Sequence, residues 1–247
     1  MAEARKIQIV LIPGLGGDHR MAYPQKDLPF DLITPDLIEM KPAETLPEYA
    51  RRFGEHLIGG RLIDNTQPLF LAGYSFGSAI ALELAPTFQP NGLILIGGLV
   101  SGGELRPIVR YFGLHFVRHI PLIAFTLATP VIRKFMRRNS EVPERDLDSC
   151  MVMYKDFSRN LFRAAYHAVA HWRLERSDIP SSRPFTIPIL RIHGECDQII
   201  TCPTANSNDN EDLLIILGAK HLINFARREA VNRAIENFID RTMQDTA

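Results

Sequence analysis

A single serine, Ser75, stands between a short apolar run and a helix-forming run, and this stretch constrains the fold more than any other. Residues 69–72 read Leu-Phe-Leu-Ala, the continuous apolar pattern of a strand buried on both faces. Residues 76–85 are mostly good helix formers and contain no proline. Gly73 and Gly77 flank the serine in the spacing Gly-x-Ser-x-Gly. The pattern therefore predicts a sharp turn from a buried strand into a helix, with Ser75 at the turn.

A turn of this kind has chemical consequences. A strained conformation at Ser75 pushes its hydroxyl out of the sheet, and the glycines let neighbouring backbone approach closely. The amides of the helix N-terminus, first that of Phe76, are then free to meet negative charge that develops on a bound group. Gly-x-Ser-x-Gly also occurs in ordinary glycine turns, but the flanking strand and helix favour a nucleophilic serine.

Further strand and helix patterns alternate along the chain. Strands buried on both faces are short apolar runs, whereas helices that cover a sheet repeat apolar residues every three or four positions. The predicted strands are residues 7–12, 30–33, 69–72, 93–96, 187–192 and 213–217, and the predicted helices include residues 46–58, 76–85 and 230–239. This alternation predicts an α/β fold: a mostly parallel central sheet of about six strands with helices on both faces and sites at the carboxyl ends of the strands.

Residues 101–184 interrupt the alternation. They contain several helical patterns separated by prolines and no convincing strand. The predicted domains are therefore an α/β core, formed by residues 1–100 and 185–247, and a helical cap inserted in it as residues 101–184. A chain of 247 residues, 46% of them hydrophobic, is long enough for one core with such an insertion.

The net charge of the chain is zero, so the overall charge does not indicate binding to nucleic acid or to an anionic membrane. The charge is unevenly distributed, because residues 101–184 hold 14 Lys and Arg against 8 Asp and Glu, a net +6 that leaves −6 for the remainder. The basic residues of the insertion form a solvated face, pair with the acidic core, or steer a small anionic substrate towards the site.

Three cysteines, Cys150, Cys196 and Cys202, are too few and too odd in number for a disulfide framework, which favours a reducing compartment. The first apolar stretch, residues 7–12, is too short for the core of a signal peptide, and no run is long enough to span a bilayer. These observations predict a cytoplasmic protein without a membrane span.

A serine hydroxyl is a poor nucleophile at neutral pH unless a base takes its proton and an acid orients that base. The sequence offers a candidate for each partner after a predicted strand. Asp197 follows residues 187–192 in the segment His-Gly-Glu-Cys-Asp, and His221 follows residues 213–217 in Gly-Ala-Lys-His. Because parallel strands end at the same edge of a sheet, Ser75, Asp197 and His221 are expected to meet there.

A glycine-rich loop, Pro-Gly-Leu-Gly-Gly-Asp at residues 13–18, follows the first predicted strand. Such loops present backbone amides, so this one is either a phosphate cradle or half of an oxyanion hole. It lacks the Lys-Ser/Thr pair of a P-loop and the Gly-x-Gly-x-x-Gly spacing of dinucleotide-binding folds. The oxyanion hole is therefore favoured, and no cofactor is predicted.

Four motifs occur in a fixed order: Pro-Gly-Leu-Gly-Gly, Gly-Tyr-Ser-Phe-Gly, His-Gly-Glu-Cys-Asp and Gly-Ala-Lys-His, each after a strand. A helical insertion follows the second motif. In this order the motifs resemble those of the α/β-hydrolase superfamily across nearly the whole chain. Within the superfamily the chain is similar to a compact, capped, bacterial-type subgroup of serine hydrolases whose substrates are not established. The resemblance implies Ser75 as nucleophile, Asp197 as acid and His221 as base. It also implies the backbone N–H groups of Leu15 and Phe76 as oxyanion donors.

The chain departs from the family pattern in two places. Pro13-Gly14 replaces the common His-Gly before the oxyanion loop, and residues 38–40 read Ile-Glu-Met instead of the frequent Gly-His-Gly. The first difference bears on how the oxyanion loop is braced.

Other residues compete for these roles. Glu195 is two residues early for the acid position, His193 also ends a strand but is structural in the family, and His19 lies just past the glycine-rich loop. His167 and His171 have the spacing of two metal ligands on one helix face. The chain has neither the glutamate of a His-Glu-x-x-His motif between them nor an evident third ligand, so an exposed helix face is favoured and no metal site is predicted.

These observations predict a serine hydrolase that cleaves a carboxylic ester or thioester of a small molecule through an acyl-serine intermediate. The fold hosts many chemistries, so a lyase, synthase or carbon–carbon bond hydrolase with the same three residues is an alternative. A non-enzymatic module that binds a small molecule under the cap is a second alternative, and the complete set of three side chains argues against it.

Overall fold

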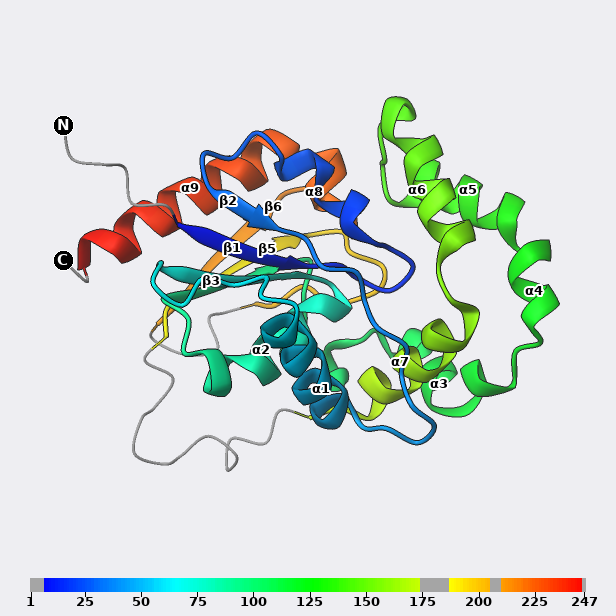
Figure 1. The fold of residues 1–247 in the computed structure, drawn as a ribbon. Coiled ribbons are helices and arrows are strands. Elements are labelled where there is room, and N and C mark those ends of the chain that lie inside the picture. The colour runs from blue at the N-terminus through cyan, green and yellow to red at the C-terminus, as the bar shows by residue number, and fades with distance from the viewer. Residues whose placement is uncertain (1–6, 174–186, 205–209, 246–247) are drawn as a thin grey trace.

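The computed structural model describes residues 7–173, 187–204 and 210–245. Six strands in these ranges form one parallel sheet in the order β2-β1-β3-β4-β5-β6 (Figure 1). They are β1 (Gln8–Ile12), β2 (Asp31–Ile33), β3 (Leu69–Tyr74), β4 (Gly92–Ile96), β5 (Ile189–Gly194) and β6 (Glu211–Ile216). The predicted α/β class and the predicted parallel sheet of about six strands are confirmed.

Two strands, β5 and β6, start two residues away from their predicted first residue, for identifiable reasons. β5 begins at Ile189, two residues later than predicted, because Pro188 lacks the amide that a central strand position requires. β6 begins at Glu211, two residues earlier than predicted. The prediction followed the apolar run alone and therefore left the carboxylate of Glu211 out of the strand. The Glu211 carboxylate lies 3.5 Å from Arg191 Nη1 of β5, so a buried ion pair lets a charged residue enter the sheet.

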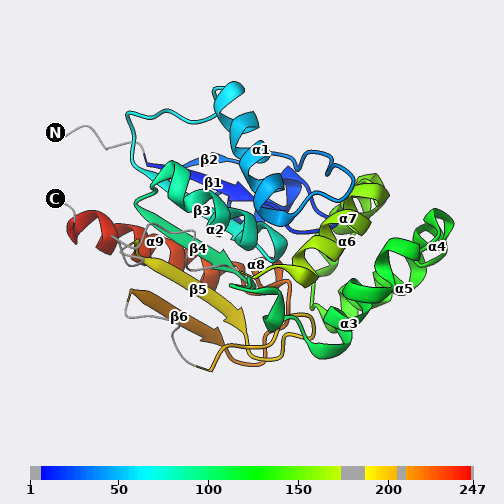
Figure 2. The same cartoon turned by 90° about the horizontal axis from the view of Figure 1, so that it is seen from below.

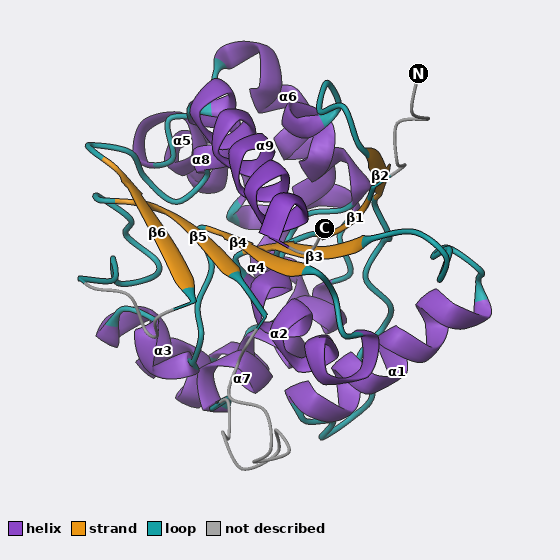
Figure 3. Cartoon of the chain, turned by 90° about the vertical axis from the view of Figure 1, so that its left-hand side faces the viewer, coloured by secondary structure: helices purple, strands orange, loops and turns teal. Residues whose placement is uncertain are grey.

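Helices cover both faces of the sheet (Figure 3). Those on one face are α1 (Leu46–Gly59) and α2 (Phe76–Phe88), and those on the other are α8 (Ile223–Ala226), α9 (Arg228–Asp245) and the 3-10 helix η1 (His19–Gln25). Each face has its own buried cluster, with Tyr49 and Phe53 of α1 in the first and Phe238 and Ile239 of α9 in the second. Because all six strands are parallel, their carboxyl ends lie at one edge of the sheet between these two helix layers.

The N-terminus of α1 is capped by a reciprocal pair. Thr45 Oγ accepts a hydrogen bond from the Glu48 amide at 3.5 Å, and the Glu48 carboxylate accepts one from the Thr45 amide at 2.8 Å. The predicted apolar stripe is buried from Leu46 to Leu57, whereas Ile58 is 59% exposed because it lies about 100° around the helix from Leu57. The predicted stripe thus identifies the buried face of α1, but its last residue, Ile58, does not lie on that face.

The chain between β4 and β5 is helical, and up to residue 173 it adds no strand to the sheet (Figures 1 and 2). Its elements are η2 (Gly102–Glu104), α3 (Pro107–His115), η3 (Val117–His119), α4 (Leu122–Leu127), α5 (Thr129–Asn139), α6 (Glu144–Asp156) and α7 (Arg159–His171). α7 joins the buried cluster of α1, and α6 joins that of α9, so the insertion packs against both layers. The predicted boundary at residues 184 and 185 lies outside the described residues.

Two pairs of neighbouring helices in the insertion are separated by short breaks. α7 is distinct from α6, because Ser158 caps α7 and accepts a hydrogen bond from the Leu161 amide at 3.2 Å. α4 and α5 are separated at Ala128. Within the described ranges, no helix combines the length and the apolar character needed to cross a membrane.

Candidate active site

Ser75 occupies a strained turn between β3 and α2. Its backbone has φ 49° and ψ −114°, a positive φ that non-glycine residues rarely adopt. A Cβ atom at Gly73 would lie 2.2 Å from the carbonyl carbon of Gly77, and one at Gly77 would lie 2.3 Å from Ile12 O. The Ser75 amide donates to Ile96 O at 3.0 Å, which ties the turn to β4. The turn therefore requires both glycines of the motif.

The candidate acid and base lie in the loops after β5 and β6. His221 Nε2 is 3.0 Å from Ser75 Oγ, and His221 Nδ1 is 2.7 Å from Asp197 Oδ2. The Asp197 carboxylate is fully buried, and the His221 side chain is 9% exposed. A proton on Nδ1 that bonds to Asp197 leaves Nε2 as an acceptor for the hydroxyl proton. The structure thus brings the three predicted residues into one line of polar contacts.

Backbone groups hold the Asp197 carboxylate. Its Oδ1 accepts hydrogen bonds from the amides of Ile199 at 2.7 Å and Ile200 at 3.0 Å. Burial raises the pKa of Asp197, but the adjacent His221 and these two amides outweigh burial and place the pKa below its usual value. Asp197 is therefore an ionised carboxylate at neutral pH.

Arg106, just before α3, also supports this acid turn. Its Nε donates to the Asp197 backbone carbonyl at 2.8 Å, and its own amide donates to Ile199 O at 2.9 Å. No local pattern in the sequence marks this role of Arg106, because the contact joins segments 91 positions apart. A residue near the start of the helical insertion therefore holds the loop of the candidate acid.

His193 of β5 lies beside the same carboxylate. Its Nε2 is 3.4 Å from Asp197 Oδ2, and its side chain is 1% exposed. Burial lowers the pKa of His193 to about 4, although the charge of Asp197 opposes this effect. His193 is therefore neutral at neutral pH, and its place next to the acid fits a structural role.

The glycine-rich loop after β1 lies directly against the serine turn. A Cβ atom at Gly14 would lie 3.3 Å from Ser75 Cβ. The Gly14 amide donates to Met21 Sδ at 3.3 Å, so a methionine of η1 braces the loop where the chain lacks the family's usual histidine. Leu15 follows in this loop and Phe76 is the first residue of α2, so both amides belong to segments that meet at Ser75. The oxyanion roles of these amides stay predictions.

A model of the alpha/beta hydrolase family matches residues 9–234. The chain belongs to the alpha/beta hydrolase family.

Several solved structures are similar to this α/β hydrolase over nearly its whole length. They include a thermophilic esterase from Thermogutta terrifontis (19% identity, TM-score 0.73, 97% of this chain and 91% of that one), a bromoperoxidase from Bacillus anthracis (18%, 0.75, 95% and 92%) and an enol-lactonase from Burkholderia xenovorans (18%, 0.73, 97% and 94%). At these identities the likeness shows the fold alone. No curated protein gives a sequence match to this chain.

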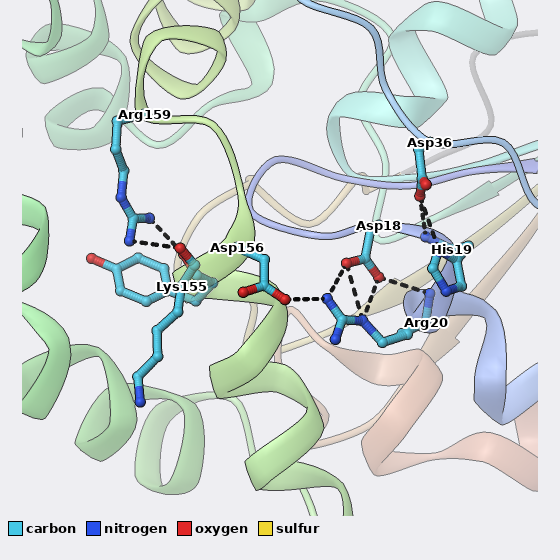
Figure 4. Close-up of polar contacts among 8 residues, drawn as sticks. Asp18, His19, Arg20, Asp36, Lys155, Asp156 and Arg159 are labelled. Atoms are coloured by element: carbon cyan, nitrogen blue, oxygen red, sulfur yellow. Dashed lines mark hydrogen bonds and ion pairs between the residues drawn. The ribbon is translucent and has the colours of Figure 1, made fainter.

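In this α/β hydrolase, two sets of polar contacts hold the segment after the glycine-rich loop (Figure 4). Arg20 binds the Asp18 carboxylate and also reaches Asp156 of α6 at 2.9 Å, which links the loop to the insertion. His19 Nδ1 lies 3.1 Å from Asp36 Oδ1. The possible ligand atoms of Asp18, His19 and Asp36 lie within 4.8 Å of one another, but the guanidinium of Arg20 already neutralises Asp18. In this cluster Asp18 is therefore paired with Arg20, and Asp36 is paired with His19.

The competing candidates take other positions in this α/β hydrolase. Glu195 Oε2 accepts a hydrogen bond from the Gly218 amide at 2.8 Å and braces the turn after β6. His19 is the partner of an exposed aspartate, as described above. His167 and His171 are neighbours on α7, with tilted rings whose centroids are 4.3 Å apart, and the described residues offer them no third metal ligand. The geometry thus favours the predicted acid and base over their rivals.

Proposed function

We propose that this α/β hydrolase is a serine hydrolase that cleaves a carboxylic ester or thioester of a small molecule. The observation that carries the proposal is the continuous contact from Ser75 Oγ through His221 to the buried Asp197 carboxylate. In such a contact the imidazole accepts the hydroxyl proton, and the carboxylate stabilises the cation that forms. The reaction needs neither a metal nor a cofactor.

In the proposed reaction, His221 Nε2 takes the proton of Ser75 as Oγ bonds to the carbonyl carbon of the substrate. The carbonyl electrons move onto its oxygen, to which the amides of Leu15 and Phe76 donate. The imidazolium then gives its proton to the leaving alcohol or thiol, and an acyl-serine forms. Water, deprotonated by His221, attacks the acyl carbon, and the carboxylic acid and free Ser75 are released.

Two further parts of the proposal concern substrate charge and location. The net charge of +6 in residues 101–184 supports a small anionic substrate, because a basic surface near a site raises the local concentration of anions. Cys150, Cys196 and Cys202 are all free thiols, which supports a cytoplasmic location.

Release of p-nitrophenol from acyl esters of graded chain length tests the hydrolase proposal. Ser75→Ala is expected to lower kcat/KM by at least about 10⁴-fold, because it removes the acyl-enzyme route. Ser101→Ala is the matched control, since that hydroxyl accepts a hydrogen bond from the Gly103 amide in η2, and this variant is expected to keep full activity. Full activity in Ser75→Ala would contradict the proposal.

A fluorophosphonate probe separates the alternatives. Labelling of Ser75 in a protein that is inert towards the whole ester panel would favour a lyase, a synthase or a carbon–carbon bond hydrolase that uses the same three residues. A folded protein whose Ser75 does not react would favour a binding module. Labelling together with ester turnover supports the serine hydrolase.

A further inference from the structure

A cavity of about 800 Å³ lies between the segment that leads into α1, the C-terminal half of α2 and the helix α7. These three helices lie on the same side of the sheet (Figure 3). None of Ser75, Asp197 and His221 lines the cavity. Its α2 residues run from Leu82 to Pro86, which is 7 to 11 positions beyond Ser75, or about 10 to 16 Å along the helix axis. The cavity is therefore separate from the candidate active site.

Apolar side chains form the floor of this cavity. Leu46 of α1, Leu82 of α2, Ala168 of α7 and the adjacent Trp172 are buried and line it. Its volume lies within the range of sites that bind small organic molecules, and such sites combine apolar walls with a few polar groups. The floor thus suits an apolar body of acyl-chain or aryl size.

Cations outnumber carboxylates around this floor. The permanently charged lining residues are the cations Lys41, Arg118, Arg163 and Arg173 and the carboxylates Glu44 and Glu83. Arg163 donates to the Arg118 backbone carbonyl, which holds the Arg163 guanidinium against the segment that carries Arg118. The side chains of Lys41, Arg118 and Arg173 form no ion pair within the described ranges of the chain.

Both carboxylates of the lining already have partners. Glu44 Oε2 lies 2.8 Å from Arg52 Nη2, and Arg52 does not line the cavity. Glu83 Oε1 accepts a hydrogen bond from Trp172 Nε1 at 2.5 Å. The negative charge of Glu44 is thus neutralised by a residue outside the cavity, and the four cations outweigh the charge of Glu83, so the net charge of the lining is positive.

We propose that this cavity binds an organic anion that has a carboxylate or phosphate head and an apolar body of acyl-chain size. The head lies among the cations of the rim, and the body lies over Leu82 and Ala168. His167 lines the same cavity and can add a ring N–H donor for the head, whereas the Nδ1–H of His171 already donates to the His167 carbonyl. This inference does not rest on the proposed hydrolase activity, because the cavity shares no residue with the candidate active site.

The fluorescence of Trp172 provides a specific test, because it is the only tryptophan of the chain and it lines the cavity. Full-length protein is titrated with octanoate and with octyl phosphate, and 1-octanol is the uncharged control. The titrations are repeated after Ser75 has been modified with a fluorophosphonate, which closes the candidate active site. The mass of the adduct reports on Ser75 separately, so a missing adduct counts against the proposed hydrolase and not against this cavity.

The double variant Arg118→Gln/Arg173→Gln removes two exposed cations from the rim. The matched control is Lys134→Gln/Arg137→Gln, which removes the same charge from exposed positions of α5 outside the cavity. The rim variant is expected to bind the anions at least about 10-fold more weakly, because charge-assisted hydrogen bonds are lost. The control variant and the phosphonylated protein are expected to bind them as the unmodified protein does.

Three results would overturn the proposal. The first is the absence of a saturable change in fluorescence with either anion. The second is equal affinity in the rim variant and the control variant, or equal affinity for octanoate and 1-octanol. The third is loss of anion binding after phosphonylation of Ser75, which would place the anion in the active site instead. Thermal unfolding of both variants establishes that each is folded.

Discussion

The burial of His193 predicts a specific pH dependence of stability. Burial lowers the pKa of this imidazole from 6.5 to about 4 in the folded protein. Because the folded pKa lies below the unfolded one, the unfolded chain binds this proton first as the pH falls. The contribution of His193 to the free energy of unfolding is therefore fully present above about pH 6.5, and it is lost as the pH falls towards 4.

The size of the effect follows from the two pKa values of His193. The change from 6.5 to about 4 corresponds to roughly 3 kcal/mol of unfolding free energy, at about 1.36 kcal/mol for each pH unit. Between pH 7 and pH 5, proton linkage at this one group removes about 2 kcal/mol. For a chain of 247 residues, a loss of this size lowers Tm by about 4 to 8 °C.

The variant His193→Gln isolates this contribution, because a neutral amide does not titrate. Urea unfolding of both proteins at pH 7 and at pH 5 gives four free energies of unfolding. All other titrating residues are shared, so wild type is expected to lose about 2 kcal/mol more than the variant on acidification. The absolute stability of the variant does not enter this difference. Equal losses in the two proteins would refute the argument that burial keeps His193 neutral.

Two further predictions concern the acid and the serine turn. Asp197→Asn is expected to lower kcat towards p-nitrophenyl esters by roughly 10⁴-fold, because an amide no longer favours the productive tautomer of His221. Glu195→Gln serves as the control variant. A loss of less than tenfold in Asp197→Asn would argue against Asp197 as the acid. Gly77→Ala is expected to cost at least about 2 kcal/mol in urea unfolding, because its Cβ would lie 2.3 Å from a backbone oxygen. Gly59→Ala, with no atom within 4 Å of the added Cβ, is expected to change stability by at most about 1 kcal/mol, and equal effects would refute the close-approach argument.

Local patterns in the sequence were sufficient for the sheet and for the turn at Ser75. The apolar runs that became β3 and β4 are short and continuous because those strands are buried on both faces. The glycines on either side of Ser75 are required by contacts of 2.2 and 2.3 Å, which no Cβ atom tolerates. These requirements act on a few neighbouring residues, so they leave a mark in the sequence that can be recognised without a structure.

Contacts between distant segments were decided only by the tertiary structure. His221 and Ser75 are 146 positions apart; the shared edge of the parallel strands and the family resemblance both predicted that they meet, but the contact between Nε2 and Oγ comes from the structure. Arg106 on the acid turn, Met21 on the glycine-rich loop and the cation-lined cavity beside α7 had no signal in the chain. The physical reason is that periodicity reports whether a segment is buried, whereas the partner of a side chain depends on how separate helices and loops pack against each other.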